Sequence, residues 1–319
     1  MPGMRNQILI FLSLVILMSC GQNKTARFTP LSFPEVVPPG MMSDPQDRAD
    51  WLAKNYWNGL TDPERTYPSD SLLTSGVSKK DVEQRISNWI SVLEMVHPST
   101  AERAVRNLAV RLIACEEKNP ESNVLETISE LMELYLYDPN SPFRYEDHYG
   151  TFVGKLVEWE GLSPELRGKY MHQSARCALN KVGTEAADFR FSDSKGRMHN
   201  LYGIKAPLIL LFFSNPGCNA CMDIINILKG DPHISEMVTA GRLEVVNVYI
   251  DEDIAEWRSY MPVYPDEWYN GFDPDLAVRT ENLYDVRAIP SLYILDEDKK
   301  VIMKDAPENK VFAFLQQYE

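Results

Sequence analysis

The sequence has few cysteines and no excess of positive charge. Its 319 residues include 5 cysteines, and 32 Lys and Arg stand against 46 Asp and Glu, for a formal net charge of −14. Proteins that bind nucleic acid neutralise phosphates with clustered Lys and Arg, so this composition argues against that class. Five cysteines are too few and too unevenly placed for a small disulfide scaffold, which needs several bridges in a short chain.

Motifs for metals and cofactors are missing as well. His97, His148 and His172 lack the paired spacing of metal ligands. No flavin or nicotinamide motif occurs in the sequence. We therefore expect no metal and no bound cofactor, so that electrons for any redox chemistry must come from an external partner.

Long apolar runs are scarce, and only the first 20 residues approach one. Arg5 precedes an apolar core from Ile8 to Met18, and Ser19-Cys20 follows. The segment resembles the signal peptide and lipobox of bacterial lipoproteins, which implies cleavage before Cys20 and lipid attachment to its thiol. By the same resemblance, a residue other than Asp after the cysteine, here Gly21, implies the outer membrane rather than the inner one. An ordinary secretory signal or an uncleaved helix is the alternative, and either one places the protein outside the cytoplasm.

The next part of the chain changes from proline-rich to helical. Residues 21–46 contain four prolines before Met41 and predict an extended tether. Residues 47–180 show apolar residues at helical spacing, as in 81–97, and predict an all-α domain of four to six helices. Ser99 begins a capping-box match, and Ser163 precedes a proline at a first helical position.

The helical part carries no catalytic constellation. Cys115 and Cys177 are isolated, and we expect them to pack as small apolar residues in helices. Whether these two cysteines form a disulfide with each other remains an open question, because sequence alone cannot establish the geometry that the bond requires.

Residues 181–319 alternate between strand and helix patterns, which is the sign of an α/β domain. The apolar run 207–214 predicts a strand buried on both faces of a sheet. It leads into Cys218-Asn219-Ala220-Cys221, after which a helical pattern begins. A second buried strand is predicted at 243–250, a hairpin at 291–295 and 300–303, and a last helix at 309–318.

The order strand, CxxC, helix has a chemical consequence. A cysteine in the first turn of a helix faces unpaired N–H groups and the positive end of the helix dipole, which favour the thiolate and lower its pKa. A sulfur three residues later lies within bonding reach. We therefore predict a redox-active pair with Cys218 as the nucleophile and Cys221 as the resolving thiol. Half of a zinc site is the alternative, but no further cysteine follows and His233 is the only later histidine.

A second motif, Ala288-Ile289-Pro290-Ser291, stands immediately before the strand 291–295. Together with the CxxC it resembles the thioredoxin superfamily, and Val182 to Phe189 resembles the opening segment of the TlpA-like periplasmic branch. The resemblance implies a cis-proline at Pro290 opposite the CxxC, with Ile289, Pro290 and Ser291 binding the substrate. A trans proline in a plain turn is the alternative.

The sequence also departs from that family. Gly217 stands where the family usually has Trp, and Ala220 stands where proline is common. Residues 255–270 hold five aromatic side chains, which either form an inserted helix that shapes substrate choice or pack a small core of their own.

These observations predict an α/β thioredoxin-like fold over 181–319, preceded by the all-α domain. The resemblance implies a membrane-anchored periplasmic thiol–disulfide oxidoreductase that reduces protein disulfides with electrons from an envelope donor protein. Two other hypotheses stay open. One is a non-enzymatic lipoprotein that uses the fold as a binding platform. The other is a peroxidase, although the Thr and Arg usual around a peroxidatic cysteine are missing.

Overall fold

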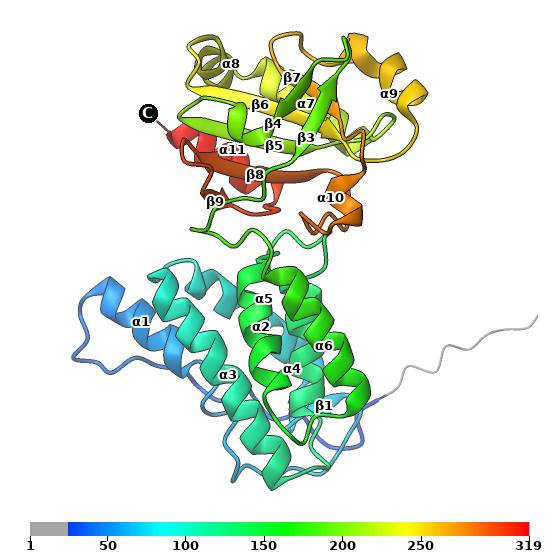
Figure 1. Ribbon diagram of the computed structural model, residues 1–319. Coiled ribbons are helices and arrows are strands. Elements are labelled where there is room, and N and C mark those ends of the chain that lie inside the picture. The colour runs from blue at the N-terminus through cyan, green and yellow to red at the C-terminus, as the bar shows by residue number, and fades with distance from the viewer. Residues whose placement is uncertain (1–24, 319) are drawn as a thin grey trace, which may run out of the picture.

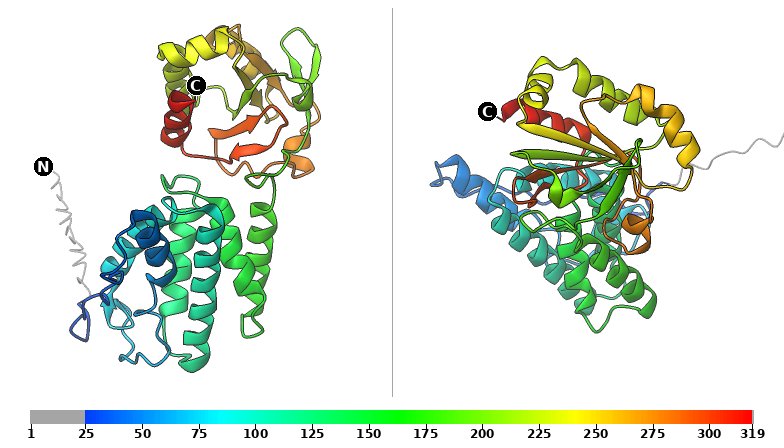
Figure 2. Two further views of the ribbon diagram at one scale, coloured as in Figure 1. Left: turned by 90° about the vertical axis from the view of Figure 1, so that its left-hand side faces the viewer. Right: turned by 45° about the horizontal axis from the view of Figure 1, so that its top comes forward.

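The computed structural model describes residues 25–318, so the expected signal peptide and Cys20 lie outside the described residues. Within this range two lobes lie end to end, a helical domain and an α/β domain (Figures 1 and 2). This confirms the predicted fold class. Over the same residues, no helix has both the length and the apolar character needed to cross a membrane.

The helical domain contains six α-helices and one short hairpin among the described residues. They are α1 (Pro45–Asn55), β1 (Leu73–Thr74), β2 (Val77–Ser78), α2 (Lys79–Leu93), α3 (Pro98–Lys118), α4 (Val124–Leu136), α5 (Glu146–Val157) and α6 (Pro164–Cys177). The count lies at the upper end of the predicted range. Helix α3 contacts α1, α4 and α5, and α5 in turn packs on α6.

The helical spacing of apolar residues explains the core of this domain. In α2 the side chains at that spacing are all buried, and Trp89 is completely enclosed. Its indole N–H donates to the carbonyl oxygen of Ala53 at 3.0 Å, so that no polar group of the ring is left without a partner. The sequence pattern therefore predicted which face of α2 is buried.

The start of α3 differs from the prediction. His97 is the N-cap, because its Nδ1 accepts the N–H of Ser99 at 3.3 Å and Pro98 occupies the first turn. The capping box expected at Ser99 is therefore wrong. Proline lacks an N–H and has a helical φ, so the helix begins at Pro98, ahead of the serine. At α6 the predicted cap is confirmed, since Ser163 Oγ accepts the N–H of Leu166.

The described part of the expected tether is not a free spacer. The Phe33 ring is only 9% exposed and packs edge-on against Trp57, with ring centroids 5.7 Å apart. The Asp70 carboxylate accepts the N–H of Arg27 at 2.5 Å, and Leu31 forms a bridge with Val77. The prolines keep residues 25–44 extended, but burial of an aromatic ring fastens the segment to the helical domain.

The α/β domain is built on one mixed sheet of seven strands in the order β4-β3-β7-β6-β5-β8-β9. Strands β5, β6 and β7 are parallel, and the other pairs are antiparallel. The strands are β3 (Arg190–Asp193), β4 (Met198–Asn200), β5 (Leu208–Phe213), β6 (Leu243–Tyr249), β7 (Tyr269–Phe272), β8 (Ser291–Asp296) and β9 (Val301–Met303). The helices are α7 (Asn219–Gly230), α8 (Pro232–Thr239), α9 (Ile254–Tyr260), α10 (Ala277–Thr280) and α11 (Glu308–Gln317).

Strand β5 lies inside this sheet, between β6 and β8, and is buried on both faces. Leu208, Leu210 and Phe212 belong to the apolar cluster under α7, α8 and α11. The alternate residues Ile209 and Phe213 belong to the cluster on the other face. A strand that is apolar at every position therefore fits its place between two cores, as its composition predicted.

The two domains meet around a cleft of about 360 Å³ between α2, α5 and the segment 302–310. His148 of α5 lines this cleft, and its ring lies 4.3 Å from the ring of Tyr145. Burial, helped by the nearby Lys310 ammonium, lowers the pKa of His148 from 6.5 to about 4. The imidazole is therefore neutral in the folded protein under conditions that protonate it in the unfolded chain.

The first prediction concerns the segment 25–44. Replacing Phe33 by Ala should lower the free energy of unfolding by about 3 kcal/mol, because a buried aromatic ring leaves a cavity. Urea unfolding followed by circular dichroism measures the loss. Val37→Ala is the matched control, since Val37 is 59% exposed, and it should change little. Equal stability of the two variants would show that the segment is not part of the domain core.

The second prediction concerns pH. Because the folded pKa of His148 lies below the unfolded one, the unfolded chain binds an extra proton between pH 6.5 and about 4, and stability falls as the pH falls through this window. From pH 7 to pH 5 the loss at this residue is about 2 kcal/mol. His148→Gln should therefore lose less stability over that interval than the wild type in urea unfolding.

The exposed His172 supplies the control for this measurement, because His172→Gln should keep the wild-type pH dependence. If His148→Gln and the wild type lost the same stability between pH 7 and pH 5, His148 would not be buried in its neutral form.

Candidate functional site

The two cysteines of the CxxC motif are joined in a disulfide, with their Cα atoms 5.2 Å apart. Strand β5 ends at Phe213, and a short turn leads to α7, for which Cys218 is the N-cap. The Sγ of Cys218 accepts the backbone N–H of Cys221 at 3.1 Å. The first sulfur therefore sits among the unpaired N–H groups at the start of a helix, where negative charge is stabilised.

The two sulfurs differ in exposure. Cys218 is half-buried, whereas Cys221 is 1% exposed and belongs to the apolar cluster that includes Phe212, Ile224 and Ile225. An incoming disulfide can reach only the residue that is partly exposed. The arrangement thus suits an attacking Cys218 and a Cys221 that acts from inside the protein.

The peptide bond between Ile289 and Pro290 is cis. Strand β8 begins directly afterwards and runs antiparallel to β5, with Ser291 opposite Phe213. This register places the residues before Ser291 and those after Phe213 at the same edge of the sheet. Ile289 and Cys218 also pack against the same apolar cluster, so the structure brings the predicted proline loop and the CxxC together.

Ser291 does not fit its predicted place in the substrate site. Its side chain is completely buried, and Oγ lies 2.6 Å from Oδ1 of Asp305. The hydroxyl is therefore directed into the domain and cannot contact a bound protein. Side chains alternate between the two faces of a strand, and the first residue of β8 is already part of the sheet.

The structure explains why glycine stands before Cys218. Gly217 has φ of +70°, a left-handed conformation that strains any residue with a Cβ. A Cβ at this position would lie 3.8 Å from the hydroxyl of Tyr260, at the end of α9. Tyr260 therefore stands beside the turn that carries Cys218.

The aromatic residues of 255–270 are divided between core and site. Trp257, Tyr264 and Trp268 are buried in the cluster under α7, and Tyr269 belongs to strand β7. Only Tyr260 is half-buried and close to the CxxC turn. The sequence left open whether these side chains shape the substrate site or pack a small core of their own. Most of them do pack, but against the main core of the domain and not against one another alone.

A polar network that the sequence did not reveal supports the CxxC turn. Asn215 Nδ2 donates to Asp251 Oδ2 at 2.8 Å, and Arg279 forms an ion pair with Asp251 at 2.9 Å. Ser214 Oγ lies 2.5 Å from Asn247 Oδ1. The carboxyl ends of parallel strands lie at one edge of a sheet, so these residues meet although β5 and β6 are far apart in the sequence.

The other described cysteines are free and buried. Burial raises the pKa of Cys115 to about 11 and that of Cys177 to about 12, which keeps both as unreactive thiols near neutral pH. The sequence left undecided whether Cys115 and Cys177 form a disulfide, and in the structure they do not. Within residues 25–318, no group of three or more His, Cys, Asp or Glu side chains is placed to hold a metal ion.

Comparison with known families matches both parts of the chain. Residues 18–180 match a domain of unknown function, DUF5106, and residues 207–301 match a thioredoxin-like family. No curated protein matches the sequence.

Solved structures resemble the chain as well. A thioredoxin-like protein from Bacteroides caccae is 30% identical with a TM-score of 0.78, over 91% of this chain and 100% of that one. The C-terminal domain of an uncharacterized protein from Bacteroides fragilis is 41% identical, with a TM-score of 0.42, over 43% of this chain and 99% of that one. The thioredoxin domain of a thiol-disulfide oxidoreductase from Bacteroides vulgatus is 19% identical, with a TM-score of 0.37, over 42% of this chain and 98% of that one.

The comparisons agree with the geometry of the site. A thioredoxin-like fold, a CxxC disulfide at the start of a helix and a cis-proline beside it are together the features of a thiol–disulfide redox protein. The match to the Bacteroides caccae protein extends over both domains, and DUF5106 accounts for the helical half. The chain therefore belongs to the thioredoxin-like proteins in which a DUF5106 domain precedes the thioredoxin-like domain.

Proposed function

We propose that this protein is a thiol–disulfide oxidoreductase that reduces disulfides of cell-envelope proteins. One observation carries the proposal. A half-buried sulfur, Cys218, lies at the N-terminus of α7, is bonded to a buried second sulfur, Cys221, and shares its sheet edge with a cis-proline.

The chemistry depends on the difference in exposure between the two sulfurs. In the reduced form, the Cys218 thiolate attacks one sulfur of a substrate disulfide, forming a mixed disulfide and releasing the other substrate sulfur as a thiolate. Cys221 then gives up its proton and attacks Cys218 Sγ, which forms the observed disulfide and releases the second substrate thiolate. The released thiolates take up protons. Two electrons have passed from the CxxC pair to the substrate.

The cis-proline loop is the proposed contact for the substrate chain. By the resemblance to thioredoxins, the backbone of Ile289 pairs with the substrate and Pro290 keeps the sulfurs accessible. The half-buried state of both residues supports this role. The buried side chain of Ser291 supports no such contact. Renewed turnover requires a dithiol donor protein in the envelope, since the sequence carries no flavin or nicotinamide motif.

Anchoring at the membrane is a separate part of the proposal. The lipobox-like Leu17-Met18-Ser19-Cys20 supports lipid attachment at Cys20 and a position at the outer membrane, facing the periplasm. Disulfide exchange with protein substrates fits this compartment, where disulfides persist.

The rival function is a binding platform without redox turnover. The glycine before the CxxC and the large helical domain favour it, because both depart from an ordinary thioredoxin. The two functions differ in whether the disulfide exchanges with other thiols.

The third prediction tests the redox function. In an insulin-reduction assay with dithiothreitol as electron source, the wild type should precipitate insulin faster than dithiothreitol alone, and Cys218→Ser should abolish this acceleration. Cys115→Ser is the matched control, because Cys115 is a buried thiol outside the site, and it should keep full activity. Unchanged turnover in Cys218→Ser would remove the assigned role, and an inactive wild type would favour the platform.

The same chemistry makes Cys221→Ser a substrate trap. Without the second sulfur, the mixed disulfide at Cys218 cannot be resolved and should accumulate. Non-reducing gel electrophoresis of envelope extracts should then show adducts that disappear with reductant and are missing from the Cys218→Ser, Cys221→Ser double variant.

The fourth prediction concerns Cys20. Expressed in a bacterial host with radiolabelled palmitate, the wild type should carry the label and sediment with membranes, and Cys20→Ala should lose both properties. Cys115→Ala should behave like the wild type. Membrane-bound but unlabelled wild-type protein would indicate an uncleaved helix, and a released, unlabelled one an ordinary secretory signal.

A further inference from the structure

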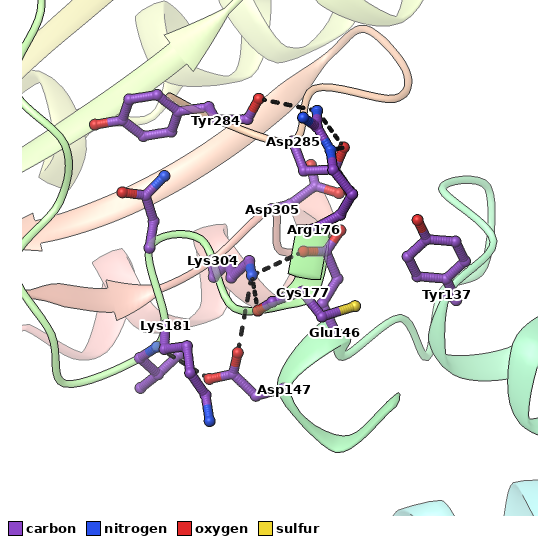
Figure 3. Close-up of polar contacts among 12 residues, drawn as sticks. Tyr137, Glu146, Asp147, Arg176, Cys177, Lys181, Tyr284, Asp285, Lys304 and Asp305 are labelled. Atoms are coloured by element: carbon purple, nitrogen blue, oxygen red, sulfur yellow. Dashed lines mark hydrogen bonds and ion pairs between the residues drawn. The ribbon is translucent and has the colours of Figure 1, made fainter. Parts of the chain in front are cut away.

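The segment between α10 and β8 carries the cis-proline, and the helical domain holds it in place. Residues 282–290 run along the boundary between the domains before they reach Pro290. Asn180, just after α6, donates its amide to the carbonyl oxygen of Leu283 at 2.8 Å. Arg176 of α6 donates to Asp285 at 2.8 Å and also to Asn282. Figure 3 shows Arg176 reaching Tyr284 and Asp285 from the helical side.

Arg287 continues these contacts closer to the site, only two residues before Ile289. Its guanidinium lies over the ring of Tyr137, 3.7 Å from the centroid, and also donates to the carbonyl oxygen of that residue. It further donates to the Glu146 carboxylate of α5. Asp285 on the same loop lies 3.3 Å from Arg287 Nε. Arg287 is therefore enclosed by one aromatic ring and two carboxylates, and two of these three groups come from the helical domain.

The chain on the other side of Pro290 is held in the same way. Ser291 is bonded to Asp305, and Arg144 of the helical domain lies 3.4 Å from the Asp305 carboxylate. Arg144 also donates to the Asp305 carbonyl oxygen at 2.6 Å. Next to it, Lys304 forms an ion pair with Glu146 at 3.0 Å (Figure 3).

These groups form one buried layer of charge between the domains. It holds four basic and four acidic side chains, none more than 20% exposed: Arg144, Arg176, Arg287, Lys304, Glu146, Asp147, Asp285 and Asp305. Buried ion pairs contribute little net stability, because desolvation offsets their attraction. Because these ion pairs and hydrogen bonds are directional, we expect their main effect to be on the position of the loop 282–290, more than on the free energy of unfolding.

We propose that the helical domain is part of the redox site. In this proposal Arg287 is a positioning residue, which holds the cis-proline loop in the place needed to bind protein disulfides. The inference rests on the proposed function. Attack by Cys218 needs the substrate sulfurs in line with the attacking sulfur, and a misplacement of about 1 Å can cost about 100-fold in rate. A small disulfide that needs no backbone pairing with Ile289 does not depend on the loop in this way.

This difference between substrates supplies the test. For Arg287→Gln, kcat/KM for insulin reduction should fall about tenfold, with most of the change in KM, because guanidinium stacking and pairing on the helical domain are lost. The rate at which the reduced protein reacts with the small aromatic disulfide 5,5′-dithiobis(2-nitrobenzoate) should stay within about twofold, since Cys218 and its helix are unchanged. Arg190→Gln is the matched control, because its ion pair with Asp275 is exposed.

A second variant changes a residue of the helical domain that contacts the loop. Tyr137→Leu removes the ring under Arg287 without altering any residue of the thioredoxin-like domain, and it should lower the insulin rate selectively as well. It also keeps the test decisive if Arg287→Gln fails to fold. If a folded variant at either position kept the wild-type ratio of insulin rate to small-disulfide rate, the inference would be overturned. A wild type that reduced neither disulfide would instead remove the proposed function.

Discussion

The antiparallel pairing of β5 with β8 is the constraint on which the site depends. With Phe213 opposite Ser291, the end of one strand and the start of the other share an edge of the sheet. The chain leaving β5 enters a helix start, which stabilises negative charge on sulfur, and the chain entering β8 passes through a cis peptide bond. A shift of this register by one residue would turn every β8 side chain to the opposite face and separate the two halves of the site.

The apolar character of β5 keeps this strand in the interior of the sheet. Its side chains are buried on both faces, in two separate clusters, so no face can turn toward solvent without a large loss of buried area. The carboxyl ends of β5 and β6 then bring Asn215 and Asp251 together beneath the CxxC turn. The chemistry of the site therefore rests on a rigid, fully apolar strand with polar groups only at its end.

The second constraint is the layer of charge between the domains. Eight ionisable side chains are enclosed there, and such a layer needs all its partners, because removing one leaves an uncompensated charge. The thioredoxin-like domain thus keeps one orientation against the helical half, and the loop that carries Pro290 lies within the contact. The similar Bacteroides caccae protein aligns over both domains, so the two domains also occur together there.

The sequence by itself determined much of the local structure and identified the cysteine pair that the structure joins in a disulfide. Helical spacing revealed the buried face of α2, the apolar run revealed β5, and the CxxC before a helix revealed Cys218 and Cys221. These features depend on short-range geometry, which a sequence displays directly.

The tertiary structure decided everything that depends on partners far apart in the chain. It turned Ser291 into the core, fastened Phe33 to Trp57, and placed Arg287 against Tyr137, 150 residues away. A lone arginine or serine has no periodic pattern that shows which group it will meet, because its partner is set only when the sheet and the two domains pack together.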